Sequence, residues 1–258
     1  MSTPHDGRVA LITGSRRGIG AAIADRLARA GYAIAVHGRS GEGRSAEAGD
    51  AVCAQLREHG VEAASFHGDI ASKAEVTALM EQVHAEFGRL DCLVLNAARA
   101  PFKESWRLLE RDLRQLVDTN VLGNVFCLQK ALPLLEQQGG HVVFLSSLGS
   151  RYMNVQYPLG PMKAAMEAMV RQWAEELRDK GIQANAICAG LVKTDAFKTL
   201  RRLWPEISAL PEACFVTPEE VADVVAFLTS PAARAIAGQT LVVDKGLSNR
   251  VMRTPPKG

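Results

Sequence analysis

Seven short apolar runs alternate with longer segments of helical periodicity along the whole 258-residue chain. Alternating strand and helix patterns favour a mainly parallel sheet, because each strand returns to the sheet through a helix. Right-handed crossovers then make a doubly wound sheet with helices on both faces the expected arrangement. The sequence predicts one α/β domain over residues 1–258, with strands at 8–13, 32–37, 62–67, 91–95, 141–145, 183–187 and 240–243 and helices at 21–30, 45–59, 73–88, 105–129, 162–180 and 218–228.

The composition indicates an ordinary soluble protein of the cytoplasm. Hydrophobic residues make up 47% of the chain and charged residues 22%, with a formal net charge of +2. This balance gives no electrostatic reason to expect nucleic acid or a membrane surface as a partner. The chain has neither a long apolar run nor a basic-then-apolar amino terminus, so a membrane span and a secretory signal are not expected. Its five cysteines are scattered without a CxxC pair, which predicts reduced thiols and no metal site.

A glycine-rich turn, TGSRRGIG, joins the first expected strand to the first expected helix at residues 13–20. Glycine lets the backbone turn tightly and approach a pyrophosphate, and the following helix offers its free N–H groups to that anion. The spacing is GxxxGxG, which differs from the GxGxxG of other dinucleotide-binding folds. The turn predicts a nucleotide site formed by Gly14, Ser15, Arg16, Gly18, Ile19 and Gly20.

This turn resembles that of the short-chain dehydrogenase/reductase superfamily, and the resemblance continues along nearly the whole chain. Four positions depart from the family pattern, namely Leu95, Ala98, Ala189 and Lys245. The resemblance implies a Rossmann-type fold and an oxidoreductase activity. The other matching segments are Gly68-Asp69-Ile70, Leu95-Asn96-Ala97-Ala98, Asn120 within DTNV, Ser146-Ser147, residues 185–190, Val192, Thr194 and Val243-Asp244-Lys245-Gly246.

The same resemblance assigns a cofactor role to four of these residues. It implies that Asp69 contacts the adenine, that Asn96 belongs to the cofactor site, and that Val192 and Thr194 contact the nicotinamide carboxamide. It also implies a homotetramer, formed through two long helices and the terminal strand. The irregular segment 191–217 is expected to act as a lid over the substrate.

NADPH is expected as the cofactor in preference to NADH. In NAD-dependent enzymes an acidic residue at the end of the second strand accepts hydrogen bonds from the ribose 2′-hydroxyl. Here that strand ends in His37-Gly38-Arg39-Ser40, without a carboxylate. Arg39 and Arg16 are placed where guanidinium groups could hold a 2′-phosphate.

The expected catalytic residues are Asn120, Ser147, Tyr157 and Lys163. By resemblance, Asn120 helps to hold a water relay, Ser147 hydrogen-bonds the substrate carbonyl, and Lys163 binds the cofactor ribose and lowers the pKa of a tyrosine. Ser146 is the alternative to Ser147, because counting back from Lys163 leads to it.

The tyrosine is displaced from both spacings that the family uses. The Tyr-x3-Lys position holds Leu159, and the Tyr-x6-Lys position of the superfamily's enoyl-thioester reductases holds Gln156. Tyr157 lies six residues before Lys163, which on a continuous helix would place the two about 120° apart. Pro158 and Pro161 oppose such a helix, and we expect Pro161 at the first helical position, the helix continuing from Met162. Tyr157 would then lie in the preceding loop as the proton donor, with Tyr152 or a mechanism without tyrosine as alternatives.

Three functions follow from these features. The first is NADPH-dependent reduction of a ketone or related carbonyl, the commonest chemistry of the superfamily. The second is reduction of a C=C bond conjugated to a thioester, because residues 146–152 resemble one group of bacterial enoyl-acyl carrier protein reductases. The third is a non-catalytic NADPH-binding protein, suggested by the missing Tyr-x3-Lys pair.

Overall fold

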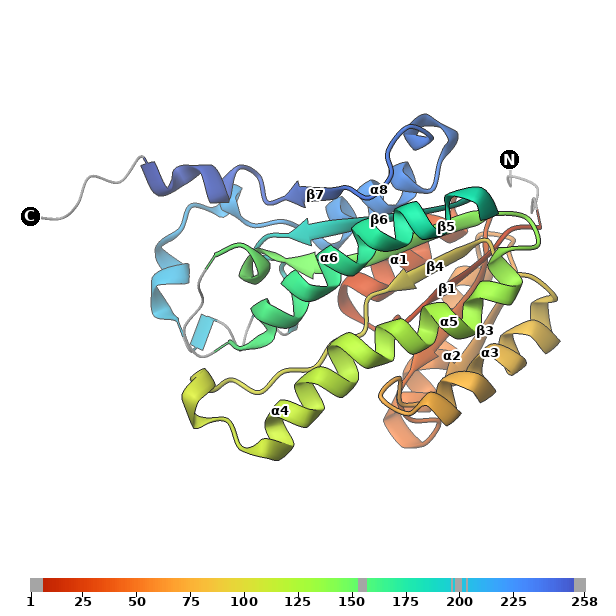
Figure 1. Cartoon of the computed structure of the whole chain (residues 1–258), viewed down its shortest axis with the longest axis horizontal. Helices are drawn as coiled ribbons and strands as arrows, with labels where there is room; N and C mark the ends of the chain where they lie inside the picture. Colours follow the sequence, from red (N-terminus) through yellow and green to blue (C-terminus); the bar gives the residue numbers. More distant parts are fainter. Residues whose placement is uncertain (1–6, 153–156, 196, 198–200, 203, 253–258) are drawn as a thin grey trace, which may run out of the picture.

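The computed structural model describes residues 7–152, 157–195, 197, 201–202 and 204–252. One parallel sheet of seven strands runs through the molecule in the order β3-β2-β1-β4-β5-β6-β7 (Figure 1). The order reverses between β1 and β4, and ligands of such sheets bind beyond the carboxyl ends of the strands at this point. The strands are β1 (Val9–Ile12), β2 (Ala33–Gly38), β3 (Ala63–His67), β4 (Cys92–Leu95), β5 (Gly140–Ser147), β6 (Ile182–Ala189) and β7 (Thr240–Val243).

Two helical layers cover the sheet, as the alternating sequence pattern predicts (Figure 1). One layer contains α1 (Gly18–Ala28), α2 (Gly43–Arg57) and α8 (Pro218–Leu228), and the other contains α3 (Lys73–Phe87), α5 (Gly123–Leu135) and α6 (Leu159–Glu176). Each layer has its own buried apolar core against one face of the sheet. The central strands β1 and β4 are buried along their whole length, as is typical of parallel sheets covered on both sides. The fold is therefore a single Rossmann-type α/β domain.

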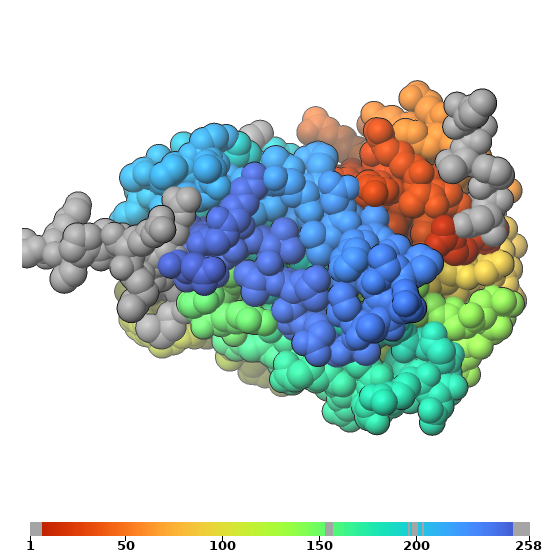
Figure 2. All heavy atoms as spheres, turned by 90° about the horizontal axis from the view of Figure 1, so that it is seen from above, coloured from red at the N-terminus to blue at the C-terminus, as the bar shows by residue number. Residues whose placement is uncertain are grey.

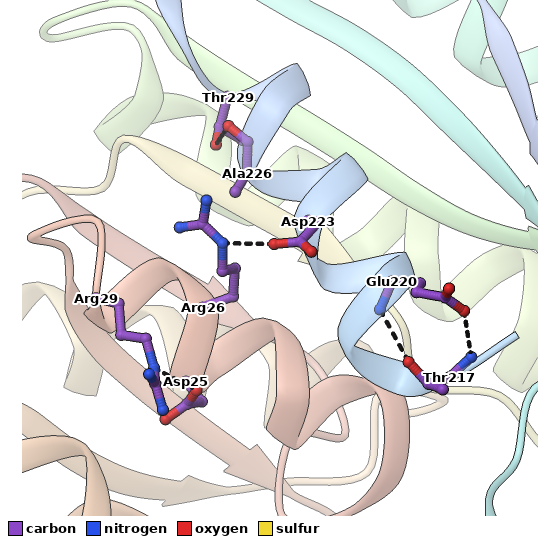
Figure 3. A network of polar contacts seen from close by, with 8 residues as sticks. All are labelled: Asp25, Arg26, Arg29, Thr217, Glu220, Asp223, Ala226 and Thr229. Atoms are coloured by element: carbon purple, nitrogen blue, oxygen red, sulfur yellow. Dashed lines mark hydrogen bonds and ion pairs between the residues drawn. The ribbon is translucent and has the colours of Figure 1, made fainter.

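Helix α1, which follows the glycine-rich turn, packs directly against α8 (Figure 3). Arg26 of α1 and Asp223 of α8 form an ion pair of 2.7 Å across this contact. The start of α8 is fixed by a capping box, in which Thr217 Oγ1 accepts from the Glu220 N–H and the Glu220 carboxylate accepts from the Thr217 N–H (Figure 3). The packing of α8 against α1 therefore fixes the position of α1, the helix that follows the glycine-rich turn.

The long helix predicted from residue 105 is interrupted in the structure. A short 3₁₀ turn (Ser105–Arg107) comes first, then α4 (Glu110–Val117), then one π-helical turn (Asp118–Leu122) that leads into α5. One extra residue shifts the helical phase by about 100°, and the eight residues of α4 before it are too short a stretch for the apolar pattern to show that shift. Such turns are frequent at functional sites, and this one contains Asn120.

The predicted start of α6 at Pro161 and Met162 is wrong. The helix begins at Leu159, after Pro158 in the N-cap position, and Pro161 lies within its first turn. A proline is tolerated there because the first-turn N–H groups have no partner within the helix. The prediction that Tyr157 precedes the helix is confirmed. Gln156 lies outside the described residues.

Residues 240–252 lie beside the expected lid segment (Figure 2, dark and light blue). Lys245 adopts φ +51°, a conformation that favours glycine, which explains why the family pattern has glycine here. Its ammonium pairs with Glu220 at 2.7 Å and so ties the segment to the cap of α8. In the expected lid segment 191–217, residues 196, 198–200 and 203 are not among the residues that the structure describes.

None of the described helices has both the length and the apolar character that crossing a membrane requires.

Candidate active site

The glycine-rich turn at the end of β1 has the backbone shape that a pyrophosphate needs. Gly14 and Gly18 adopt φ angles of +68° and +57°. A Cβ atom at Gly20 would lie 2.5 Å from the Gly14 carbonyl oxygen, so no other residue fits there. Helix α1 begins at Gly18, so its unpaired N–H groups are at the turn. The residues present therefore fit the diphosphate of a dinucleotide.

His37 at the end of β2 holds this turn in place. The Gly14 N–H donates to His37 Nδ1 at 3.1 Å, and the His37 N–H donates to Ser15 Oγ at 2.9 Å. The proton of the imidazole is consequently on Nε2, which lies 2.9 Å from the Gly68 carbonyl oxygen. Burial lowers the pKa of His37 to about 4, so the ring is neutral at physiological pH. Sequence reasoning missed this role, although a histidine in an otherwise apolar strand was a signal for it.

Asn96 and Asp69 form the other two sides of the predicted cofactor site. Asn96 Nδ2 donates to the carbonyl oxygens of Thr13 at 2.8 Å and Gly14 at 3.1 Å, which joins the loop after β4 to the turn. The Asp69 carboxylate accepts from the Ala71 N–H at 3.0 Å, in the loop after β3. Both residues therefore lie at the carboxyl edge of the sheet, Asn96 beside the switch point and Asp69 after the edge strand β3.

The two predicted phosphate ligands, Arg16 and Arg39, have different surroundings. The Arg16 guanidinium points inward and lies within 3.2 Å of five acceptors, namely Ser40 O, Ser45 O, Ser45 Oγ, Ser65 Oγ and Phe66 O. It joins the loop after β2 to α2 and β3. Arg39 is exposed at the end of β2. The Arg16 guanidinium is therefore engaged by acceptors of the protein itself, whereas Arg39 is exposed to solvent.

Thr194 lies next to the turn on the other side, two residues after Val192. Gly18 is in contact with the Thr194 side chain, since a Cβ at Gly18 would lie 3.6 Å from Thr194 Cγ2. Val192 is buried and forms an isolated β-bridge with Val216. A cavity of about 640 Å³ opens here between Gly18, Thr194 and the described part of the lid segment.

Lys163 is the fifth residue of α6 and is buried, with 4% of its surface exposed. Its ammonium donates to the Leu145 carbonyl oxygen at 2.5 Å and lies 4.6 Å from the centre of the Phe144 ring. Burial lowers the pKa of Lys163 to about 8, and the nearby carboxylate of Glu167 raises it. The lysine is therefore held at the end of β5 by Leu145, which lies two residues before Ser147.

The two adjacent serines at the end of β5 differ in their partners. Ser146 Oγ donates to the buried Glu167 carboxylate. Ser147 Oγ is buried and has no hydrogen-bond partner among the described residues. An unpaired buried hydroxyl costs free energy, which a ligand that accepts its hydrogen bond would recover. This contrast favours Ser147 as the substrate-binding serine.

Asn120 braces the loop that follows β4. Its side-chain Oδ1 accepts from the Arg99 N–H at 3.0 Å, and Nδ2 donates to the carbonyl oxygens of Arg99 at 2.7 Å and Leu116 at 2.9 Å. The π turn that carries Asn120 packs against α6, the helix of Lys163. The structure thus brings Asn120, Ser147 and Lys163 to one edge of the sheet.

The two candidate tyrosines lie in different environments. Tyr157 stacks on Phe102 with ring centres 5.4 Å apart and meets Trp204 edge-on at 6.3 Å. Burial raises its pKa, so the hydroxyl keeps its proton at neutral pH. No hydrogen bond joins Tyr157 to Lys163 among the described residues. Tyr152 is 47% exposed.

This fold and this site define an oxidoreductase that uses a nicotinamide dinucleotide. Residues 14–248 match the profile of the family described as enoyl-(acyl carrier protein) reductase. The chain therefore belongs to the short-chain dehydrogenase/reductase superfamily, as its sequence motifs predict.

Relatives and solved structures of the same kind match over almost the whole chain. A 1-cyclohexenylcarbonyl-CoA reductase of Streptomyces collinus is 36% identical over 261 aligned positions, which cover 96% of this chain and 91% of that protein. The 3-oxoacyl-[acyl-carrier-protein] reductase FabG of Staphylococcus aureus is 34% identical over 242, covering 92% and 97%. The structure of a 7α-hydroxysteroid dehydrogenase with NADH and 7-oxo glycochenodeoxycholic acid superimposes with a TM-score of 0.86 at 30% identity, covering 94% and 95%.

Proposed function

We propose that this protein is an NADPH-dependent reductase of 2-enoyl thioesters, which reduces the C=C bond conjugated to the thioester. The observation that carries this proposal is Leu159. It occupies the position from which the family's ketone reductases present their tyrosine hydroxyl, and it is 3% exposed in the first turn of α6. A leucine at this position can neither donate a proton nor bind one.

The chemistry of the two reductions explains why this matters. When bound, the reduced nicotinamide supplies a hydride. Addition of hydride to a ketone forms a strongly basic alkoxide, so a hydroxyl must protonate the oxygen directly. Addition to the β-carbon of an enoyl thioester forms an enolate instead, in which the negative charge is delocalised onto the thioester oxygen and the α-carbon then takes the proton. A hydrogen bond to that oxygen stabilises the enolate.

The chain's own groups fit this second reaction. The unpaired Ser147 hydroxyl is suited to donate to the thioester oxygen, and the Lys163 ammonium places a positive charge near the same edge of the sheet. Tyr157 serves as the donor of the α-carbon proton, a role that does not require a hydroxyl at the position of Leu159; it lies in the loop just before α6, and burial keeps its hydroxyl protonated at neutral pH. The enoyl-reductase family profile and the Streptomyces collinus relative further support C=C reduction.

A 3-oxoacyl thioester is the second candidate substrate, and the similarity to the FabG proteins favours it. Assays of NADPH oxidation with matched 2-enoyl and 3-oxoacyl thioesters distinguish the two. We expect kcat/KM to be at least about tenfold higher for the enoyl substrate, equivalent to about 1.4 kcal/mol of transition-state stabilisation. The reverse order would assign the protein to ketone reduction.

We also propose that Arg39 selects NADPH over NADH. Its guanidinium is exposed at the end of β2, where no carboxylate is present to bind a ribose 2′-hydroxyl. Replacing Arg39 by alanine is expected to raise the Kd for NADPH about tenfold and to leave the Kd for NADH within twofold, because only NADPH carries the 2′-phosphate. Fluorescence titration with both cofactors measures this, with exposed Arg44→Ala of α2 as control. Equal losses for both cofactors would contradict the assignment.

We further infer that the chain forms a homotetramer. Three apolar side chains are exposed on one face of α4. They are Leu113 and Val117 of the helix and Leu109, the residue before it. Val242 on the edge strand β7 and Phe227 on α8 are exposed as well. The range 105–129, which contains α4, and the terminal strand β7 are among the regions through which the family resemblance predicts association.

A further inference from the structure

A carboxylate that sequence analysis did not single out is buried beside the candidate active site. Glu167 of α6 is 7% exposed. Its Oε1 accepts from Ser146 Oγ and lies 2.5 Å from Ser150 Oγ, and its Oε2 lies 3.7 Å from the Arg151 guanidinium. A buried carboxylate is costly unless it is paired and hydrogen-bonded, and both oxygens of this one have partners.

These partners belong to the segment that carries Ser147. The short 3₁₀ turn Leu148–Ser150 follows Ser147 directly, and Ser150 Oγ also lies 2.9 Å from the Ser147 carbonyl oxygen. The turn also rests directly on the first turn of α6, where a Cβ at Gly160 would lie 2.1 Å from the Gly149 carbonyl oxygen. Glu167 and this backbone contact therefore fix the turn at two places, and with it the position of the unpaired Ser147 hydroxyl.

Glu167 also lies one helical turn after Lys163, on the same side of α6. Burial lowers the pKa of Lys163 to about 8, and Glu167 opposes this effect. The other titratable groups around this network are Arg151 after the turn, Cys188 of β6 and Asp244 after β7. Burial raises the pKa of Cys188 to about 11 and also raises that of Tyr157, so neither group ionises near pH 8.

We propose that Glu167 is a positioning residue for the reduction, which fixes the turn that carries Ser147 and holds the Lys163 ammonium in its charged form. One carboxylate thus serves the serine through hydrogen bonds and the lysine through its charge. The inference relies on the proposed thioester reduction only for its kinetic assay.

The test compares Glu167→Gln, which keeps the shape but removes the charge, with Glu167→Asp, which keeps the charge. For Glu167→Gln we expect kcat to fall about tenfold and the alkaline limb of kcat/KM to move about one unit to lower pH, because Lys163 loses its proton more readily without the negative charge. Glu167→Asp is expected to lower kcat but to keep the limb in place. Glu176→Gln, an exposed glutamate of the same helix, is the control and should match the parent.

A purely structural role would lower kcat and stability without moving the limb, and that result would overturn the charge part of the proposal. An unchanged kcat in Glu167→Gln would overturn the whole proposal. A second measurement needs no substrate. The contribution of Lys163 to the free energy of unfolding, taken as the difference between each protein and its Lys163→Met counterpart, should rise with pH above about 8, because the folded chain then binds fewer protons at this lysine than the unfolded one, in which Lys163 has its ordinary pKa of 10.5.

In Glu167→Gln this rise should begin at lower pH, because the folded-state pKa of Lys163 is lower. The same onset in both proteins would contradict the inference even if no thioester is reduced. If the parent reduces neither thioester but the onset in Glu167→Gln is still at lower pH than in the parent, the proposed function alone would be contradicted.

Discussion

Lys163→Met is expected to remove about 99.9% of kcat/KM while making the cofactor-free protein more stable. The methionine keeps the volume of the side chain but removes the ammonium that the reaction needs. Lys163 has a pKa of about 8 in the folded chain and 10.5 when unfolded, so its charge is costly to bury. Removing it should raise the free energy of unfolding by about 2 kcal/mol at pH 7, after allowance for the lost hydrogen bond to Leu145.

The pH dependence provides a check on the origin of this stabilisation. Between pH 8 and 10.5 the Lys163 ammonium becomes neutral in the folded state and so destabilises the parent less, and the difference between the variant and the parent should shrink over this range. Steady-state kinetics and denaturant unfolding at several pH values measure both effects. Lys180→Met, at an exposed lysine after α6, is the control and should change neither quantity by much. Retention of near-parental activity in Lys163→Met would contradict the assigned role.

Tyr157→Phe is expected to lower kcat about a hundredfold, since it removes the proposed proton donor. The phenylalanine ring still fits between Phe102 and Trp204, so the aromatic cluster and the fold should persist. The Kd for NADPH should change less than twofold, because Tyr157 has no predicted cofactor contact.

Tyr152→Phe is the matched control, because Tyr152 is exposed and lies only five residues earlier. Its kcat should stay within about twofold of the parent value, as is usual for an exposed side chain outside the site. The opposite pattern, with a large loss only in Tyr152→Phe, would transfer the role of donor to Tyr152. Full activity in both variants would favour a proton supplied by water.

The fold could be predicted from the sequence because its strongest signals are local. Apolar runs and helical periodicity gave all seven strands, and the range 218–228 predicted for α8 coincides with the observed helix. The errors occur where local rules permit more than one outcome. Pro158 and Pro161 are compatible with a helix that starts at either Leu159 or Met162, and the structure has the earlier start.

The candidate site could be predicted only in part, because several of its contacts join residues far apart in the sequence. The glycine-rich turn was visible as a motif. The inward position of Arg16 depends on acceptors in the loop after β2, in α2 and in β3. The contact between Glu167 and Ser146 spans 21 residues and two different elements. No spacing rule for a single helix or strand could have indicated it.

The most direct measurement of the central claim is the product formed from a 2-enoyl thioester and NADPH in deuterated water. Suitable substrates include a straight-chain 2-enoyl-CoA and 1-cyclohexenylcarbonyl-CoA, which the name of the Streptomyces collinus relative specifies. The account predicts a saturated acyl thioester that carries one deuterium at the α-carbon and one unlabelled hydrogen from the cofactor at the β-carbon, detected by mass spectrometry and NMR. Recovery of unchanged enoyl thioester, together with conversion of the matched 3-oxoacyl thioester to its 3-hydroxy product, would contradict it.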